Sequence, residues 1–369
     1  MTQVGGAGGA GGAGGAGGAG GAGGAGGAGG AGGAGGPVLG TLGDAYVNSV
    51  MVDALILGRE GTTVPETSSY APALPTIGDP TQMARWEQWV RAYVAIGELL
   101  QGIKFKTTAT SFQVMSSASL IAEIDRPKKS TFEAQIPLVL SWAELRNERA
   151  TEIMAQIDPP YAFWSSIIYM HPDRTRRTFE LINLVLQLCV YVEMRIKHSL
   201  ACWRPVEHNA QVQPMITTPG HGSFPSGHAT QVFAVAHVLK SLLNLNPTNP
   251  AHALIIEQLE RQAARIATNR VIAGVHFPVD SMAGRMLGVA LGEYFVGRCA
   301  GGQKFMGRRF TAAGIDSAPT TDFNPFNVDQ ILAAPSPFYS QTAGAAITQS
   351  ALMKPLWGAA KDEWKVRFP

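Results

Sequence analysis

The stretch PGHGSFPSGHATQ occupies residues 219–231, in the second half of this chain. Its centre, Pro225-Ser226-Gly227-His228, combines a hydroxyl, an imidazole and a glycine that lets the backbone approach a ligand closely. We expect a tight turn here, followed by a helix over residues 229–244. His228 would then lie at a helix start, where free amides and the helix dipole favour an anion.

Two further blocks flank this stretch and supply the cations that an anion site needs. Lys197 and Arg204 precede it as Lys-x6-Arg-Pro, and Arg270, His276 and Asp280 follow it as Arg-x5-His-x3-Asp. Guanidinium forks and an ammonium group match the oxygens of a tetrahedral oxyanion. A continuing helix would present Lys197 and Arg204 on one face, since they lie two turns apart. We expect four helix ends to converge on one pocket.

The rest of the chain predicts an all-α fold, a helical bundle that could consist of two packed four-helix bundles. Helical periodicity or continuous apolar character recurs along the chain, and Asp79-Pro80 has the form of a helix start. The longest apolar run, Leu181 to Val192, is too short to span a bilayer and is closed by Glu193. The expected helical segments are 80–100, 112–124, 138–157, 175–203, 229–244, 251–268 and 280–297.

Composition predicts four regions along the 369 residues. Residues 5–36 repeat Gly-Gly-Ala and carry no side chain larger than methyl, so 1–36 should be a disordered tail. Residues 37–78 are rich in Gly, Pro, Thr and Ser and should form an irregular lead-in. The α-helical catalytic domain then covers 79–300, and 301–369 should wrap irregularly over it.

Charge and cysteine content exclude several classes of protein. The net charge is only +2 and no basic stripe is visible, which argues against nucleic acid as a partner. Three cysteines, Cys189, Cys202 and Cys299, do not form a disulfide framework and should be buried free thiols. No signal peptide is recognisable, so we expect a soluble protein without a membrane span, cytoplasmic by default.

The three blocks together resemble the superfamily that joins vanadium-dependent haloperoxidases with type 2 phosphatidic acid phosphatases and bacterial acid phosphatases. One departure is Asn269, where the phosphatase version of the motif usually has Ser before the Arg. His221, seven residues before His228, is similar to the second histidine that bromoperoxidases have at this spacing. The resemblance therefore favours the haloperoxidase branch, although a solvent-exposed loop histidine remains an alternative for His221.

The resemblance also implies a role for each residue. His276 would be the axial ligand of vanadium(V) in a vanadate cofactor, and Asp280 would accept the other ring N–H, with a plain helix cap as the alternative for Asp280. His228 would act as the acid/base, Lys197 would polarise bound peroxide, and His221 would tune the halide step. The residues expected to hold the vanadate oxygens are Lys197, Arg204, Ser226, Gly227 and Arg270.

The predicted function is thus a vanadate-dependent haloperoxidase, which oxidises bromide or iodide with hydrogen peroxide and halogenates a small organic acceptor. A first alternative is a soluble acid phosphatase that forms a phosphohistidine on His276. A second is a non-catalytic oxyanion-binding or assembly protein, although binding alone needs no acid/base opposite a nucleophile. A helical core of this size is also compatible with a homodimer.

Overall fold

The computed structural model describes residues 49–63, 73–333 and 335–368. It divides into two compact units, one covering Ala7–Arg91 and the other chiefly Ala92–Pro369. The Gly-Gly-Ala repeat lies outside the described residues.

The first unit contains the helix start that Asp79-Pro80 predicted. The Asp79 side chain accepts a hydrogen bond from the Thr81 amide, and Pro80 opens the 3-10 helix η1 (Pro80–Arg85). The lead-in also contains a regular element, α4 (Ser49–Thr62), where the sequence suggested irregular chain. Helix α5 (Gln88–Leu100) follows η1 after the extended residue Trp86, so the single helix expected over residues 80–100 is divided in two.

Helix α11 (Gly227–Leu242) lies among the other long helices of the second unit. It is buried on nearly all sides, as a helix that is apolar all round should be. Its neighbours are α9 (Arg176–Leu200), α12 (Pro250–Ile272) and α13 (Pro278–Ala300). These four helices agree with the predicted segments to within a few residues, because long apolar periodicity is a strong signal.

Shorter elements connect and cover these helices. The segment predicted as one helix over 138–157 is divided among α6, η2 and α7. The C-terminal region, expected to be irregular, carries short elements and the helix α15. The connecting elements are α6 (Lys129–Trp142), η2 (Ala143–Leu145), α7 (Arg146–Ala155), α8 (Tyr161–Ile168), α10 (Pro205–His208), η3 (Ala210–Val212), α14 (Ala312–Ser317), η4 (Val328–Gln330) and α15 (Met353–Asp362).

A five-stranded mixed sheet shows that the all-α prediction was wrong. Its strand order is β2-β3-β4-β5-β6, in which only β4 and β5 pair in parallel. The segment 112–124, expected to be helical, forms most of β3 and β4 instead. The strands are β2 (Ile103–Thr107), β3 (Ser111–Ser116), β4 (Ser119–Asp125), β5 (Arg308–Phe310) and β6 (Tyr339–Ser340).

Two physical reasons explain why the sheet was missed. In β3 the apolar side chains of Phe112 and Val114 are buried two residues apart, which is strand periodicity within too short a run to exclude a helix. Strands β5 and β6 are shorter still, and they form because the C-terminal segment pairs with β4 and with itself. That pairing joins residues far apart in sequence, so local propensity carries little information about it.

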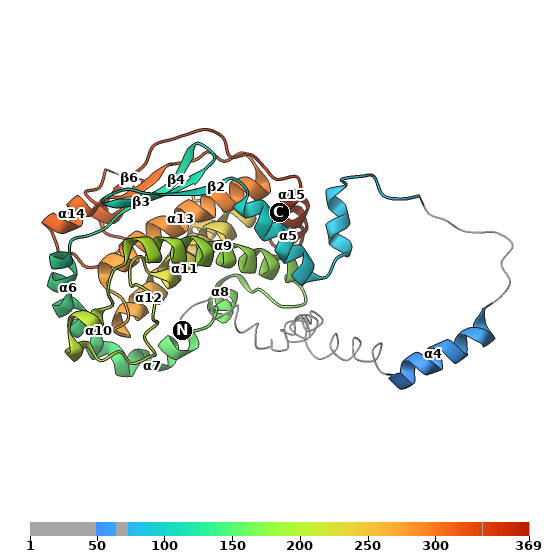
Figure 1. Ribbon diagram of the computed structural model, residues 1–369, viewed down its shortest axis with the longest axis horizontal. Helices are drawn as coiled ribbons and strands as arrows, with labels where there is room; N and C mark the ends of the chain where they lie inside the picture. The colour runs from blue at the N-terminus through green and yellow to red at the C-terminus, as the bar shows by residue number, and fades with distance from the viewer. Residues whose placement is uncertain (1–48, 64–72, 334, 369) are drawn as a thin grey trace. The chain divides into compact units, whose positions relative to one another are not determined.

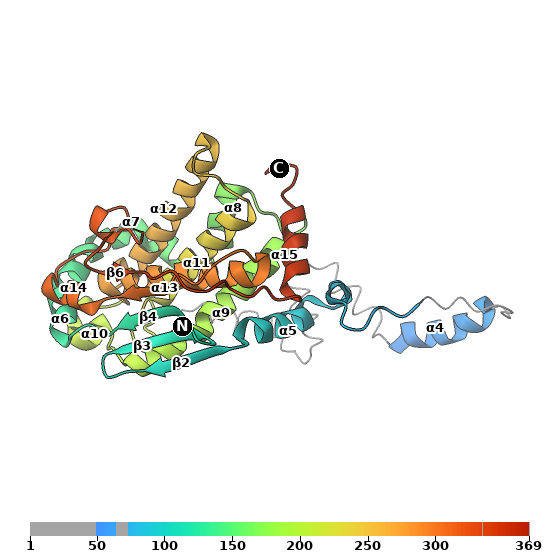
Figure 2. The ribbon, with the colours of Figure 1, turned by 90° about the horizontal axis from the view of Figure 1, so that it is seen from above.

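The sheet lies along one side of the long helices (Figures 1 and 2). Strands β4 and β5 contact α13, and β3 contacts α9. Val114, Ala122 and Ile124 are fully buried in this layer. The sheet therefore buries apolar surface of α9 and α13, the two helices that carry Lys197 and Asp280.

Two expectations from composition can be compared with the described residues. Cys189, Cys202 and Cys299 are free and buried, as predicted. Across residues 49–63, 73–333 and 335–368, no helix combines the length and apolar character needed to cross a lipid bilayer.

The close packing of α11 against α13 depends on Gly288. A Cβ atom at this position would lie 2.2 Å from the Thr230 carbonyl oxygen and 3.1 Å from the Ala234 amide nitrogen of α11. Both neighbours are backbone atoms inside a helix and cannot move aside independently. Gly288 therefore sets the distance between the helices whose N-terminal ends carry His228 and Asp280.

We predict that Gly288→Ala lowers the free energy of unfolding by about 1–3 kcal/mol, the usual cost of overpacking a core. Gly97→Ala in α5 is the matched control, because nothing lies within 4 Å of its added Cβ. The control should leave stability unchanged or raise it by up to about 1 kcal/mol, since alanine favours a helix. Urea unfolding followed by circular dichroism measures both, and equal stability of the two variants would contradict this account of the helix contact.

Candidate active site

Four chain segments meet around one narrow cavity. They are the C-terminal part of α9 with the turn that follows it to Arg204, the segment that leads into α11, the C-terminal turn of α12 and the loop between α12 and α13. This is the convergence of helix ends that the motif spacing suggested. The side chains and backbone that line the cavity belong to Glu193, Arg204, His221, Gly227, His228, Arg270, Val275 and His276.

Lys197 and Arg204 reach this region by a different route from the one expected. Helix α9 ends at Leu200, and Ala201 adopts a left-handed conformation with φ of 47°. Its amide bonds to the Lys197 carbonyl, so the chain turns before Arg204. The expectation that one continuing helix carries both side chains was therefore wrong. Pro205 instead opens the new short helix α10 directly after Arg204.

The ammonium of Lys197 is buried and bonded to backbone carbonyls. Its Nζ lies 3.1 Å from the Gly222 oxygen, 2.8 Å from the Ser223 oxygen and 2.5 Å from the Pro225 oxygen. Burial and the nearby Arg204 lower the pKa of Lys197 to about 7. Three acceptors nevertheless require three N–H donors, which only the charged form has, so we assign a positive charge. These hydrogen bonds from Lys197 stabilise the loop that carries Ser226 and Gly227.

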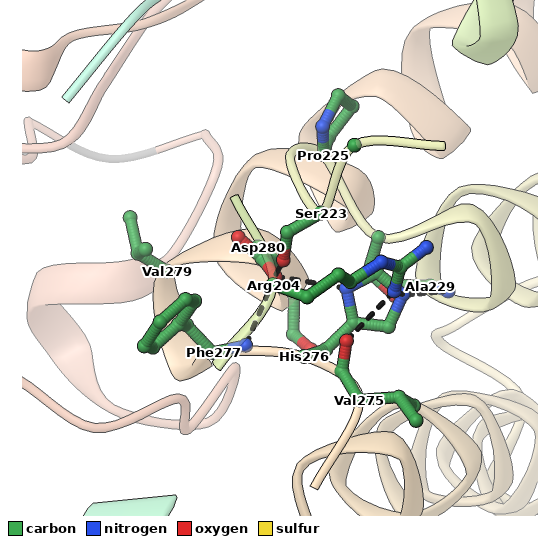
Figure 3. Close-up of polar contacts among 12 residues, drawn as sticks. Arg204, Ser223, Pro225, Ala229, Val275, His276, Phe277, Val279 and Asp280 are labelled. Atoms are coloured by element: carbon green, nitrogen blue, oxygen red, sulfur yellow. Dashed lines mark hydrogen bonds and ion pairs between the residues drawn. The ribbon is translucent and has the colours of Figure 1, made fainter. Parts of the chain in front are cut away.

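His276 is oriented by Asp280 (Figure 3). Its Nδ1 lies 2.8 Å from Asp280 Oδ2, and Arg204 Nη1 lies 3.0 Å from its Nε2. Asp280 accepts the Nδ1 proton, and Arg204 can only donate, so the lone pair of the ring is on Nε2. Burial, followed by the charges of Arg204 and Lys197, lowers the pKa of His276 well below its ordinary value. The ring is thus neutral, with its basic nitrogen at the cavity.

Asp280 combines the two roles that were left open for it. The same oxygen, Oδ2, also accepts bonds from the Phe277 amide at the start of α13 and from the Ser223 hydroxyl. It is therefore both a helix cap and the partner of His276. Burial raises the pKa of Asp280 to about 6, while the Ser223 and Phe277 bonds act in the opposite direction.

His228 faces the same cavity from the first turn of α11. Its Nε2 lies 2.9 Å from the backbone carbonyl of Gln156, an acceptor, so Nε2 carries a proton and Nδ1 remains for proton transfer. Burial, followed by Arg270, lowers the pKa of His228 well below its ordinary value. In the free site His228 is therefore a neutral base.

Arg204 and Arg270 supply the guanidinium groups of the site, and burial lowers both of their pKa values to about 10. Both remain cationic at neutral pH. Arg270 Nη2 donates to the Ile153 carbonyl, whereas Nε and Nη1 are buried without a hydrogen-bond partner among the described residues. Buried guanidinium donors without partners are costly, and a bound oxyanion would satisfy them.

His221 also lines the cavity and is held by Arg204. Its Nδ1 lies 3.1 Å from Arg204 Nη2, which can only donate, and 3.2 Å from the Gly222 carbonyl oxygen, which can only accept, so the two contacts favour opposite tautomers, with the proton of the neutral ring on Nε2 or on Nδ1. That Nε2 is buried and has no partner within the described part of the chain. Burial, followed by Lys197 and Arg204, lowers the pKa of His221 to about 4. The alternative of a solvent-exposed loop histidine does not describe this geometry.

The remaining predicted residues lie behind the cavity wall. Ser226 caps α11, accepting at 3.4 Å from the Ala229 amide, and its own amide donates to the Asp280 carbonyl. Lys197 and Asp280 hold the loops as described above. Six of the predicted residues line the cavity, namely Arg204, His221, Gly227, His228, Arg270 and His276. The other three, Lys197, Ser226 and Asp280, support the segments that form its wall.

Sequence reasoning missed two residues that contact this machinery. Gln156 bonds to His228 through its backbone and to Asn269 through its side chain, at 2.9 Å in each case. Asn269, the departure from the phosphatase motif, therefore helps to hold the residue that orients His228. Glu193 lines the cavity itself, one helical turn before Lys197. Its only sequence signal was a charged residue at the end of an apolar run.

Comparison with known proteins identifies the domain that contains this site. Residues 180–297 match the family model of the PAP2 superfamily, so the chain carries a PAP2 superfamily domain. The comparison with curated proteins gave no match. A transmembrane PAP2 type phosphatidylglycerolphosphate phosphatase from Bacillus subtilis is 17% identical, with a TM-score of 0.37 over 60% of this chain and 96% of that one. A TM-score this low supports no argument about the overall fold.

We predict that Asp280→Asn disturbs the tautomer of His276, because an amide presents an N–H group where the carboxylate accepts three bonds. Nitrogen-15 shifts of the histidine rings should show Nε2 unprotonated in the wild type and a mixture of tautomers in the variant. Affinity for inorganic phosphate should fall by about 10–100-fold, as for other partners of a liganding histidine. Asp316→Asn is the control, since that carboxylate bonds to Lys128 and Thr131, away from the cavity. Unchanged His276 shifts would contradict the role given to Asp280.

Proposed function

We propose, for a chain that carries a PAP2 superfamily domain, that the site hydrolyses a phosphate ester with His276 as the nucleophile. The members of this superfamily are mostly phosphatases. The observation that carries the proposal is the neutral His276 ring, whose Nδ1–H is bonded to Asp280 and whose basic Nε2 points to Arg204. A nucleophile with its tautomer fixed, beside guanidinium groups, is what attack on a phosphate requires.

Binding would place the phosphoryl oxygens against the cations of the cavity. Arg270 has two donor nitrogens, Nε and Nη1, without partners among the described residues, and Arg204 would exchange its contact with His276 Nε2 for a phosphoryl oxygen. The cavity wall beside Gly227 adds the N-terminal end of α11, which favours negative charge. The positive charge of Lys197 would also attract the bound phosphoryl group, although Lys197 lies behind the loop that precedes α11 and does not line the cavity.

The reaction would proceed in two displacements. Nε2 of His276 attacks phosphorus, the bond to the leaving oxygen breaks, and His228 delivers a proton to that oxygen. Water then attacks the phosphohistidine, His228 takes its proton, the P–N bond breaks and phosphate leaves. A bound dianion would raise the low pKa of His228 and so allow it to act as an acid in the first displacement.

A second candidate is the vanadate-dependent haloperoxidase, and His221 is the observation that favours it. The unpaired donors of Arg270 fit orthovanadate as well as phosphate, because both are tetrahedral oxyanions. His276 Nε2 would hold the vanadium, with Arg204 and Arg270 at its oxygens. Bound vanadate would supply a Lewis acid for hydrogen peroxide. His228 would take a proton at Nδ1, and the buried Nε2 of His221 would face the halide side.

One assay separates the two candidates. Protein treated with chelator should hydrolyse an aryl phosphate, and added orthovanadate should inhibit that activity by occupying the cavity. His276→Ala should lower hydrolysis by about a thousandfold or more, as loss of a nucleophile does, whereas His252→Ala, in the first turn of α12 away from the cavity, should not. Bromination of a dye that requires added vanadate and peroxide, without any hydrolysis, would contradict the first candidate and support the second. Activity that is indifferent to His276→Ala would contradict both.

Substitution of His221 also distinguishes the two candidate activities. We predict that His221→Ala lowers vanadate-dependent bromination more than aryl phosphate hydrolysis, because His221 lies beside Arg204 and takes no part in the two displacements. Both rates are measured on the same preparation, with vanadate affinity as a third readout. A variant that loses hydrolysis first would show that His221 acts in phosphoryl transfer instead.

A further inference from the structure

The cavity contains a carboxyl group that the proposed chemistry does not use. Glu193 projects from α9, is 1% exposed and lines the same space as His228, Arg270 and His276. A carboxylate beside a bound oxyanion would repel it at short range. Its presence in a cavity built from cations therefore requires a physical explanation.

The contacts of Glu193 show that it is not held as half of an ion pair. Its Oε1 accepts a hydrogen bond of 2.9 Å from Gln231 Nε2, and its buried Oε2 has no partner among the described residues. Lys197, the cation one turn later on α9, directs its Nζ bonds to the three loop carbonyls instead. An ionised Oε2 without a donor would be very costly here, whereas a protonated one has a proton to give.

Gly227 shows where this carboxyl lies relative to the anion. A Cβ atom on Gly227 would come within 2.7 Å of Glu193 Oε1 and 3.4 Å of Oε2. The carboxyl therefore packs against the first residue of α11, which is the end of the helix that favours an anion. The glycine of the Pro-Ser-Gly-His block leaves room for Glu193 in this chain.

We infer that Glu193 is protonated in the liganded site and donates its Oε2–H to the bound oxyanion, so that anion binding takes up a proton. This rests on the proposed function, since it assumes a tetrahedral dianion in the cavity.

The surrounding charges agree with this assignment. Burial raises the pKa of Glu193 to about 7, although Lys197 and Gln231 act in the opposite direction. An added dianion would raise that pKa further.

Above about pH 7, binding of the anion must bring in a proton, so affinity for the anion falls as pH rises. The titratable and charged groups around it are Cys189 and Lys197 on α9, Arg204, His221 and His276 on loops, His228 on α11, Arg270 on α12 and Asp280 on α13.

Sulfate is the appropriate probe, because it is a tetrahedral dianion that does not itself titrate near neutral pH. Titration calorimetry of the full chain in buffers of different ionisation enthalpy counts the protons taken up on binding. Above about pH 7.5 the wild type should take up about one proton more than Glu193→Gln, and its affinity should fall by up to about tenfold more per pH unit. The variant keeps both an acceptor for Gln231 and a donor for the anion, so it should bind sulfate at least as tightly.

Glu180→Gln, on the same helix but outside the cavity, is the control and should behave as the wild type does. Equal proton uptake and equal pH dependence in the wild type and Glu193→Gln would overturn this inference while leaving the oxyanion site intact. Failure of the wild type to bind either sulfate or inorganic phosphate would contradict the proposed function and, with it, the role of Glu193.

Discussion

The Asp280 carboxylate is the contact on which both the fold around the site and its chemistry depend. One oxygen accepts bonds from Ser223 before α11, from His276 and from the Phe277 amide that begins α13. The backbone of Asp280 also accepts from the Ser226 amide. These bonds fix the start of α13 to the loop that precedes α11. They also fix the tautomer of His276, so this histidine and the loop before α11 are positioned together.

The buried cations around the cavity explain why we expect it to bind an anion. Arg204, Arg270 and Lys197 are almost completely buried. Lys197 is satisfied by carbonyls of the loop, whereas Arg270 retains donors without partners among the described residues. Keeping such groups out of water costs free energy, and the bound oxyanion that we propose would offset that cost. The same field keeps His228 and His276 neutral until the anion arrives.

The sequence predicted much of this site because motif spacing and helix periodicity are local signals. Residues 176–200, 227–242, 250–272 and 278–300 are long apolar helices, and their ends bring the motif residues together. The sheet was missed because β5 and β6 form only by pairing with distant chain. The turn at Ala201 was missed because a left-handed residue other than glycine or asparagine has no clear sequence signal. Glu193 and Gln156 could not be assigned, since their roles depend on contacts across the fold.

The most direct test of the account is to identify the residue that carries phosphate during turnover. Protein quenched while it hydrolyses an aryl phosphate would be digested and mapped by mass spectrometry under alkaline conditions, in which phosphohistidine survives. The account predicts a phosphoryl group on His276, formed in the wild type and missing from His276→Ala. Hydrolysis that proceeds with phosphate on a different residue, or with no phosphorylated residue under conditions that trap phosphohistidine, would contradict it.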